Sequence, residues 1–559
     1  MKDFSFLIGG KAGDGIKQAG HFLAQLFNEL GYNIFIYEDY QSLITGGHNF
    51  SIVRASDKRI LSHKQKVDFA IVFNKDTLEK NQENFKKETI IIYDSDVIQS
   101  NDLPKKYKAV AFPMSNVLKE SNLPLIVRNA VSLGILAGIL KIDFELVKKI
   151  IENSVHKKIE ENIKVAEIGY KEGLEHKNGF EIEKLKNEPR KILTGNEAIA
   201  LGAVRAGMKF YFAYPMTPAS GILHFLAANE DKFGVKAIHP ENEIAVALMA
   251  EGAATAGKRA MVGTSGGGFA LMVEALSLAG QAEIPIVFVL SQRPGPATGI
   301  PTYTSQADLL FSLFAGHGEF LKIVVAPGDV DEAMFLTAMA MNLSWKYQTP
   351  AIILSDKHLS ESVFSAYYDE NKIKIEQPKL WSGKGDYKRY SDEKDGISSL
   401  AFLGDKNAIV KATSYEHNEF GITTENSEEA KKMAEKRLRK KITLLKELKG
   451  EKTINVLGNK KSKNVLIVWG STKGAAVEAA ENLGIKVIQP MFIEPFPADE
   501  IKKELKGAKK IIDIETNATG QMAYILKANG IEVDEKILKY DGRPFIIEKL
   551  EEKIKKIIK

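Results

Sequence analysis

Residues 239–269 read HPENEIAVALMAEGAATAGKRAMVGTSGGGF, and this stretch decides the fold of the middle of the chain. Its first part, 241–257, is rich in Ala and Gly and has the periodicity of a helix. An apolar strand (259–264) follows, and then a glycine turn. Small residues on such a helix permit close packing on a sheet that is covered on both faces, so the stretch predicts an α/β domain.

The same pattern extends to both sides of this stretch. Upstream, a helical segment that starts at Gly195 gives way to the strand KFYFAY (209–214) and a proline-flanked turn. Downstream, a second helix (269–281) leads to the strand PIVFVL (285–290). Alternating helices and strands of this length predict one α/β domain over 192–360.

The N-terminal region shows a similar order. The apolar strand Phe4–Ile8 runs into the glycine-rich stretch 9–15, a helical pattern follows, and NIFIYE then forms a second strand. Strand, turn, helix and strand predict a βαβ unit. With the strand-like runs 68–73 and 89–94, this region becomes a domain over 1–185, and the charged segment 172–191 is expected to be a linker.

The C-terminal third divides into a connector and a last domain. Between 361 and 460 the periodicity weakens: 382–396 is expected to be a polar connector and 425–449 one long charged helix. Alternating strands and helices resume over 461–559, where we expect a helix over 473–483 and a strand at KVIQP (486–490). The fold class is therefore α/β, with three α/β domains joined by a helical and irregular connector.

Composition excludes several kinds of protein and site. The 559 residues carry a net charge of only +5, without the concentrated basic face of a nucleic-acid-binding protein. The Cys count is 0, which rules out disulfides, thiolate zinc sites and cysteine-ligated iron–sulfur clusters on this chain. The N-terminus lacks a signal peptide and no apolar run approaches the ~20 residues that span a bilayer. We therefore expect a cytoplasmic protein.

Glu243 is the sharpest candidate for chemistry. It starts a helix of small apolar residues, which would partly enclose its carboxyl group. Burial favours the protonated form and would raise the pKa of Glu243, as suits a group that shares a proton. Glu241 and Glu243 could instead simply favour the N-terminus of the helix electrostatically.

The N-terminal glycines admit two interpretations. Backbone N–H groups at a turn that opens a helix can cradle a phosphate, and the candidates are Gly9, Gly10, Gly13 and Gly15. Their spacing does not follow G-x-G-x-x-G, however, and a tight strand–helix turn without a ligand fits equally well.

Several separated motifs, in order, resemble one family. Besides the stretch around Glu243, the resemblance rests on GGKAGDGI, SLITGGHN (42–49), YPMTP (214–218), RPGPATGIPTYTSQADL (293–309), WGSTKG (469–474), NATGQ (517–521) and YDGRP (540–544). The chain resembles the α subunit of 2-oxoacid:ferredoxin oxidoreductases with a γ domain fused ahead of it, the KorA-like type. The resemblance implies a coenzyme A-associated γ domain, a pyrimidine-binding domain for thiamine diphosphate and a transketolase C-terminal-like domain.

The resemblance also implies roles for residues. Glu243 would hydrogen-bond N1′ of the cofactor's aminopyrimidine, and Tyr214, Pro215, Ser265 and Gly266 would line the cofactor. Thr217 would donate to a substrate oxygen or to the cofactor, or else belong only to a rigid turn. Arg293 would pair with the 2-oxoacid carboxylate or make a structural salt bridge, and Thr298 would help to bind substrate. Metal ligands are expected to be absent from this chain.

One residue departs from the family's motifs, and one triplet resembles a motif that is incomplete here. Thr45 stands where the family usually has Arg, which puts an anion contact there in doubt. Gly13-Asp14-Gly15 imitates half of the magnesium and diphosphate motif of thiamine enzymes, but the asparagine expected about one βα step later is missing. We interpret the triplet as a decoy. His48 and His239 are expected to be structural.

The resemblance implies partners as well as cofactors. A β subunit would hold the diphosphate of thiamine diphosphate, its Mg²⁺ and a [4Fe-4S] cluster, and two αβ units would assemble. Coenzyme A would be a co-substrate and ferredoxin the electron acceptor.

The substrate and some alternatives remain open. 2-Oxoglutarate is favoured, with pyruvate and branched-chain 2-oxoacids as alternatives. A non-catalytic subunit that binds coenzyme A or a nucleotide is another alternative, but it leaves the YPMTP motif, Glu243 and Arg293 unexplained. A self-sufficient, transketolase-like enzyme would need a complete diphosphate motif, which the sequence lacks.

Overall fold

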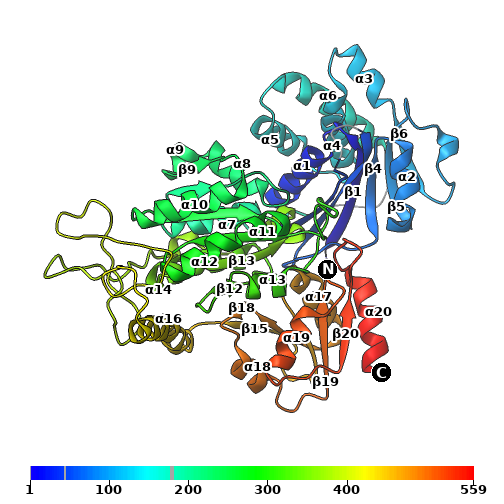
Figure 1. Cartoon of the computed structure of the whole chain (residues 1–559). Helices are drawn as coiled ribbons and strands as arrows, with labels where there is room; N and C mark the ends of the chain where they lie inside the picture. The colour runs from blue at the N-terminus through cyan, green and yellow to red at the C-terminus, as the bar shows by residue number, and fades with distance from the viewer. Residues whose placement is uncertain (1, 43–45, 177–181) are drawn as a thin grey trace. The chain divides into compact units, whose positions relative to one another are not determined.

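The backbone forms two compact units in this computed structural model, which describes residues 2–42, 46–176 and 182–559. The first unit contains residues 1–193, 362–367 and 546–550, and the second contains residues 194–361, 368–545 and 551–559. The α/β fold class predicted from the sequence is confirmed by the alternating elements of both units (Figure 1). The predicted domain boundaries at 185, 360 and 460 stay predictions.

In the first unit, the described residues form an eight-stranded sheet with the order β6-β5-β4-β1-β3-β2-β14-β7. The strands are β1 (Asp3–Ala12), β2 (Asn33–Asp39), β3 (Gly46–Ser56), β4 (Val67–Val72), β5 (Phe85–Asp94), β6 (Lys108–Phe112), β7 (Ile192–Thr194) and β14 (Val363–Ser365). The main helices are α1 (Ile16–Glu29), α2 (Lys75–Lys80), α3 (Met114–Glu120), α4 (Arg128–Ile139), α5 (Phe144–Ser154) and α6 (Ile159–Glu175). The segment predicted as a linker thus begins inside α6.

The predicted βαβ unit is split by a strand that the sequence pattern did not reveal. β3 lies between β1 and β2 and pairs antiparallel with both. Its pattern was hidden because polar side chains are buried in it, including Ser51 and Arg54. The Arg54 guanidinium donates to both carboxylate oxygens of Asp3, at 2.9 and 2.8 Å, which compensates for its burial.

The expected glycine turn at 9–15 is shorter than predicted. Gly9 and Gly10 lie in β1, where a Cβ would come 2.4 Å from Thr77 Cγ2 and 2.7 Å from Asp14 Oδ2, respectively. These two glycines therefore make room for neighbouring side chains. The turn itself is formed by Gly13 and Gly15, whose φ angles of 96° and 72° favour glycine.

The larger sheet of the second unit has seven strands among the described residues, in the order β18-β12-β13-β11-β10-β8-β9. The strands are β8 (Phe210–Phe212), β9 (Lys236–Ile238), β10 (Ala260–Thr264), β11 (Val287–Gln292), β12 (Ile323–Val325), β13 (Ala351–Asp356) and β18 (Phe492–Glu494). All pairs are parallel except β12 with β18. A strand from the predicted last domain thus completes the sheet of the predicted middle domain.

Helices pack closely around this sheet. They are α7 (Gly195–Arg205), α8 (Ser220–Ala228), α9 (Glu230–Phe233), α10 (Glu243–Thr255), α11 (Gly266–Leu271), α12 (Val273–Gln281), α13 (Leu309–Phe314), α14 (Val330–Tyr347) and α15 (Lys357–Glu361). α7 and α14 are in contact, and a Cβ on Gly202 would come 2.3 Å from the Met334 carbonyl oxygen. Gly202 therefore permits the close packing of α7 against α14.

The second sheet of this unit has the order β15-β17-β16-β19-β20. Its strands are β15 (Ile454–Gly458), β16 (Asn464–Val468), β17 (Lys486–Pro490), β19 (Lys510–Glu515) and β20 (Glu535–Leu538), with helices α17 (Lys473–Leu483), α18 (Ala498–Glu504), α19 (Gln521–Ala528) and α20 (Ile547–Ile558). The predicted helix 473–483 and strand KVIQP are confirmed with the same bounds.

The connector is more ordered than its composition indicated. The predicted charged helix is confirmed as α16 (Ser427–Leu448). The segment predicted as a polar connector, however, buries Tyr387, Arg389 and Tyr390. Arg389 donates 2.7 Å hydrogen bonds to Gln348 Oε1 and to the Glu283 carbonyl oxygen, so its charge is compensated inside the protein.

No helix among the described residues combines the length and the apolar character needed to cross a bilayer.

Candidate functional site

Three loops that carry the predicted site residues leave neighbouring strands of the seven-stranded sheet. They follow β8, β10 and β11, which are adjacent and parallel. Carboxyl ends of parallel strands meet at one edge of a sheet, where open α/β folds bind ligands. The predicted residues Thr217, Ser265 and Arg293 therefore belong to one edge, and Glu243 joins them through its contact with the β10 loop.

The Glu243 side chain is buried, with 5% of its surface exposed, and starts α10. Asn242 supplies the helix cap, accepting a 3.0 Å hydrogen bond from the Ala245 amide. The Glu243 carboxylate lies over Gly268, where a Cβ would come 2.7 Å from Glu243 Oε1. No described residue donates a hydrogen bond to this carboxylate. A carboxyl group on a largely buried side chain, with no hydrogen-bond partner among the described residues, is suited to a ligand that supplies the partner.

Thr217 and Arg293 are joined directly. Arg293 Nη1 donates a 2.7 Å hydrogen bond to the Thr217 carbonyl oxygen, which fixes the YPMTP turn to the loop after β11. Burial lowers the pKa of Arg293, and the Asp308 carboxylate opposes that shift. The Thr217 hydroxyl makes no hydrogen bond with any described residue. The pair therefore presents a cation beside a free hydroxyl.

The remaining predicted residues differ in exposure. Ser265 is fully buried, and its hydroxyl oxygen has no hydrogen-bond partner among the described residues. Tyr214 is 39% exposed and its ring lies edge-on to His239, with 5.6 Å between ring centroids. Pro215 and Thr298 are exposed, and Gly266 is partly buried. Like Glu243, Ser265 is a buried residue whose side chain has no hydrogen-bond partner among the described residues, whereas Thr298 is exposed.

The N-terminal glycines belong to the first unit, in which Asp14 is already engaged. Asp14 Oδ1 accepts a 2.9 Å hydrogen bond from Arg128 Nη2, and Asp14 Oδ2 accepts one of 2.9 Å from the Lys11 amide. Because both oxygens are used, Asp14 is a poor ligand for magnesium, in keeping with its interpretation as a decoy. The space beside Gly13 is open, with no atom within 4 Å of a Cβ built there.

His48 was predicted to be a structural residue. His48 is buried and its Nε2 lies 2.8 Å from Asn81 Nδ2, an arrangement that fits a structural role. Burial lowers the pKa of His48. Thr45 lies outside the described residues. No group of three or more His, Cys, Asp or Glu side chains suited to a metal occurs in the part of the chain that the structure describes.

Asp308 is a site residue that sequence reasoning did not single out. Its carboxylate lies over Gly266, where a Cβ would come 2.6 Å from Asp308 Oδ2. Burial raises the pKa of Asp308 to about 6, and Arg293 partly opposes that shift. The only sequence signal was its place in the quoted stretch 293–309.

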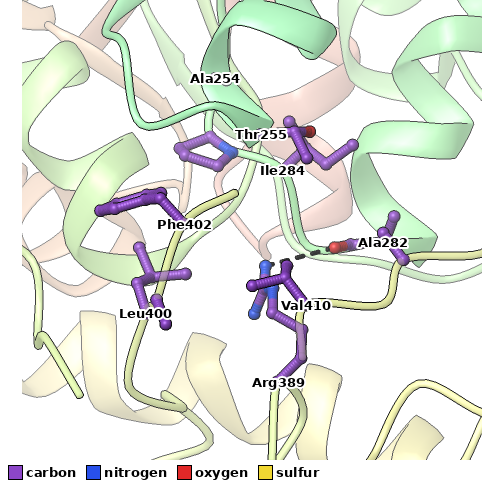
Figure 2. A pocket seen from close by; sticks show the side chains of 11 residues that line it. Ala254, Thr255, Ala282, Ile284, Arg389, Leu400, Phe402 and Val410 are labelled. Carbon is purple, nitrogen blue, oxygen red and sulfur yellow. Dashed lines mark hydrogen bonds between the residues drawn. The ribbon is translucent and has the colours of Figure 1, made fainter. Parts of the chain in front are cut away.

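Figure 2 shows a different hollow, between the connector and the larger sheet's helices, with Arg389 next to Ala282 and with Phe402 and Leu400 on its wall. Its volume of about 20 Å³ has room for a water molecule and for no organic ligand. None of its lining residues is a predicted site residue.

Comparisons with known proteins agree with the geometry. The family described as pyruvate flavodoxin/ferredoxin oxidoreductase, thiamine diphosphate-binding, matches residues 201–436, and the pyruvate ferredoxin/flavodoxin oxidoreductase family matches residues 5–172. The α subunit of 2-oxoacid:ferredoxin oxidoreductase from a Sulfolobus species is 34% identical over 99% of this chain and 97% of its own length. The 2-oxoglutarate synthase subunit KorA of Archaeoglobus fulgidus is 32% identical over 58% of this chain and 88% of its own length.

A solved structure is similar over the full length. The 2-oxoglutarate:ferredoxin oxidoreductase from Magnetococcus marinus, with 2-oxoglutarate, coenzyme A and succinyl-CoA bound, superimposes with a TM-score of 0.92. It is 30% identical, and the match covers 100% of both chains. The likeness therefore extends over the whole length of both chains.

Proposed function

This chain belongs to the family of 2-oxoacid:ferredoxin oxidoreductase α subunits, and from that premise we propose that it forms the pyrimidine side of a shared thiamine diphosphate site that acts on 2-oxoglutarate. The observation that carries the proposal is the Glu243 carboxylate, buried and without a donor at the carboxyl edge of the sheet. A ligand nitrogen that shares a proton with this carboxyl group would complete it.

The residues present fit that cofactor. Glu243 would share a proton with N1′ of the aminopyrimidine, donating it as the carboxylic acid and accepting the hydrogen bond once N1′ is protonated. The unpartnered Ser265 hydroxyl offers a second contact. Tyr214, Pro215 and Gly266 would line the ring. When bound, thiamine diphosphate supplies the carbon nucleophile for decarboxylation of the 2-oxoacid, and the protein supplies orientation and charge.

Substrate recognition is assigned to the Thr217–Arg293 pair. The Arg293 guanidinium would bind the carboxylate next to the keto group, and the Thr217 hydroxyl would donate to the keto oxygen. Thr298 would extend the site on its exposed side. The preference for 2-oxoglutarate is supported by the ligand of the Magnetococcus marinus enzyme and by the KorA relatives.

The overall reaction needs a partner. One 2-oxoacid and one coenzyme A would give acyl-CoA and CO₂, with two electrons passed one at a time to two ferredoxins. This chain has no Cys to ligate a [4Fe-4S] cluster, so the cluster would lie on a β subunit. We also assign the diphosphate and its Mg²⁺ to that subunit. An assembly of two αβ units follows from the resemblance.

The regions would divide the work. Residues 1–185 would form the coenzyme A-associated γ domain, 192–360 the pyrimidine-binding domain, 361–460 the connector and 461–559 the transketolase C-terminal-like domain. Within the N-terminal glycine stretch, Gly13 is the part that would be open to a phosphate of coenzyme A. Gly9, Gly10 and Gly15 instead face the side chains of Thr77, Asp14 and Asn129, respectively.

Anaerobic assay tests the proposal. The chain is co-expressed with its β partner, and viologen reduction is measured with coenzyme A, thiamine diphosphate and a panel of 2-oxoacids. We expect reduction that needs both chains and is fastest with 2-oxoglutarate. Glu243→Gln should remove activity while the complex stays assembled, and the exposed Glu241→Gln should not. A complex that binds coenzyme A but reduces viologen with no 2-oxoacid would favour a non-catalytic binding subunit instead.

A further inference from the structure

Asp308 occupies a helix-capping position without capping the helix. It is the N-cap residue of α13, and its side chain makes no cap hydrogen bond. Asp at this position ordinarily accepts a hydrogen bond from the first turn. Its carboxylate instead lies over Gly266, and no described residue donates a hydrogen bond to it. Helix stabilisation therefore does not explain this residue.

The position of Asp308 is nevertheless fixed. Its amide donates a 3.0 Å hydrogen bond to Gln292 Oε1, and Gln292, which is fully buried, donates one of 3.0 Å to the Ser355 carbonyl oxygen. Two residues on, the Leu310 amide donates 2.9 Å to Gln521 Oε1. Neighbouring groups thus hold the backbone and leave the carboxylate over the functional edge.

Few charged groups face this carboxylate. The adjoining elements α11 (GGGFAL), α13 (LLFSLF) and β11 (VFVLSQ) contain no titratable side chain. On α19 the near residue is Gln521, and Tyr524 and Lys527 lie towards the solvent. Asp356 at the end of β13 is bound by Thr304 and by the Leu359 amide. Arg293 and, across the first residues of α11, Glu243 remain as the charged groups of its surroundings.

We infer that Asp308 is a positioning residue that sets how strongly Arg293 holds the carboxylate of the 2-oxoacid. This inference rests on the proposed function. An ionised Asp308 offsets part of the guanidinium charge and repels an incoming carboxylate. A protonated Asp308 does neither, and its O–H is free to donate to an oxygen of the substrate. Substrate affinity should therefore fall as Asp308 ionises.

The pKa of Asp308 places this change in substrate affinity in a pH range that can be assayed. Burial raises the pKa of Asp308 to about 6. Protonation therefore changes between about pH 5 and pH 7, while Arg293 stays charged throughout.

The test compares Asp308→Asn with the wild type, both as complexes with the β subunit. KM for 2-oxoglutarate and kcat are measured from pH 5.5 to 8.5, with the exposed Asp231→Asn as the matched control. Wild-type KM should rise severalfold across the range. Asp308→Asn should have a KM that is several-fold lower than wild type at pH 8 and nearly independent of pH, with kcat within about twofold. Asp308→Glu should restore the pH dependence.

Each other outcome overturns the inference. If the Asn variant keeps the wild-type KM profile, Asp308 does not modulate Arg293. If both Asp308→Asn and Asp308→Ser fail to assemble, as followed by size and melting temperature, its role is structural. A wild-type complex without activity on any 2-oxoacid would contradict the proposed function itself, so the two failures are distinguishable.

Discussion

Gln306 and Thr516 are hydrogen-bonded to each other twice: the Gln306 amide donates to the Thr516 carbonyl oxygen at 2.7 Å, and the Thr516 amide donates to Gln306 Oε1 at 2.9 Å. Gln306 also donates through Nε2 to the Trp469 carbonyl oxygen at 2.8 Å. One fully buried side chain thus joins the loop after β11 to two strand ends of the second sheet. The motifs at 293–309, 469–474 and 517–521 meet at this residue.

Removal of that side chain should weaken the joint. Gln306→Ala leaves the Thr516 amide buried without this partner, at a cost of about 1–3 kcal/mol. The Trp469 carbonyl loses one hydrogen bond but keeps the one from Thr472 Oγ1. We expect a lower free energy of unfolding and, because the loop also carries Arg293, a raised KM. Chemical denaturation and steady-state kinetics measure both. Gln377→Ala, at an exposed position, is the control, and equal behaviour of the two variants would contradict the role assigned to Gln306.

Lys473 forms a second joint between the sheets of this unit. Its buried ammonium lies 2.5 Å from Asp329 Oδ2 and also contacts Glu332. Burial opposes the charge of Lys473, but the two carboxylates prevail and raise its pKa. Lys473→Met leaves two buried carboxylates without a cation and should lower the free energy of unfolding by about 3–5 kcal/mol. Lys527→Met, on the surface, should change it by less than about 0.5 kcal/mol. A melting temperature for Lys473→Met close to wild type would contradict the prediction.

Sequence periodicity predicted the elements that are apolar along their length. The strand β11 is an example, because burial on a covered sheet demands apolar side chains there. The sequence pattern did not predict β3, because polar residues are buried in it. Arg54 is buried in an ion pair with Asp3, and Ser51 is small enough to be buried; local patterning encodes neither. The strand β18 was not predicted for another reason. Its partner β12 is distant in sequence, and three residues are too few for a period to appear.

The site was predictable to the extent that its residues lie in recognisable motifs. Glu243, Thr217 and Arg293 were named from the sequence, but the hydrogen bond between Arg293 and the Thr217 carbonyl was not, because it joins loops of different strands. Asp308 was overlooked for a similar reason. From the sequence, an Asp in front of a helix is interpreted as a helix cap. Only the fold shows that the Asp308 carboxylate does not cap α13 and faces Gly266 instead.

Glu251 makes the stability of the chain dependent on pH. It is 3% exposed, both carboxyl oxygens lack partners among the described residues, and burial raises its pKa to about 8. Between about pH 4.5 and pH 8, the folded state therefore still holds a proton on Glu251 that the unfolded state has already released. Stability should fall as pH rises through this window, by up to about 1.4 kcal/mol per pH unit from this group. Glu251→Gln should flatten the dependence and stabilise the protein at pH 8, whereas Glu241→Gln should leave the profile unchanged. Parallel profiles for wild type and Glu251→Gln would show that Glu251 is not buried in its protonated form.

Neighbouring glycines in the turn after β10 provide the most direct test of the Glu243 geometry. A Cβ at Gly268 would lie 2.1 Å from Thr264 Oγ1 and 2.7 Å from Glu243 Oε1, so Gly268→Ala must displace the carboxylate. A Cβ at Gly267 would meet only the Ala297 carbonyl oxygen, at 4.0 Å. Displacement by about 1 Å can reduce a rate by about 100-fold, so we expect kcat to fall by that order in Gly268→Ala and to stay near wild type in Gly267→Ala. Affinity for thiamine diphosphate, followed by fluorescence quenching in the αβ complex, should weaken only in Gly268→Ala. If both variants retained full activity and cofactor affinity, the position of Glu243 over Gly268 would not be the one used in the working enzyme.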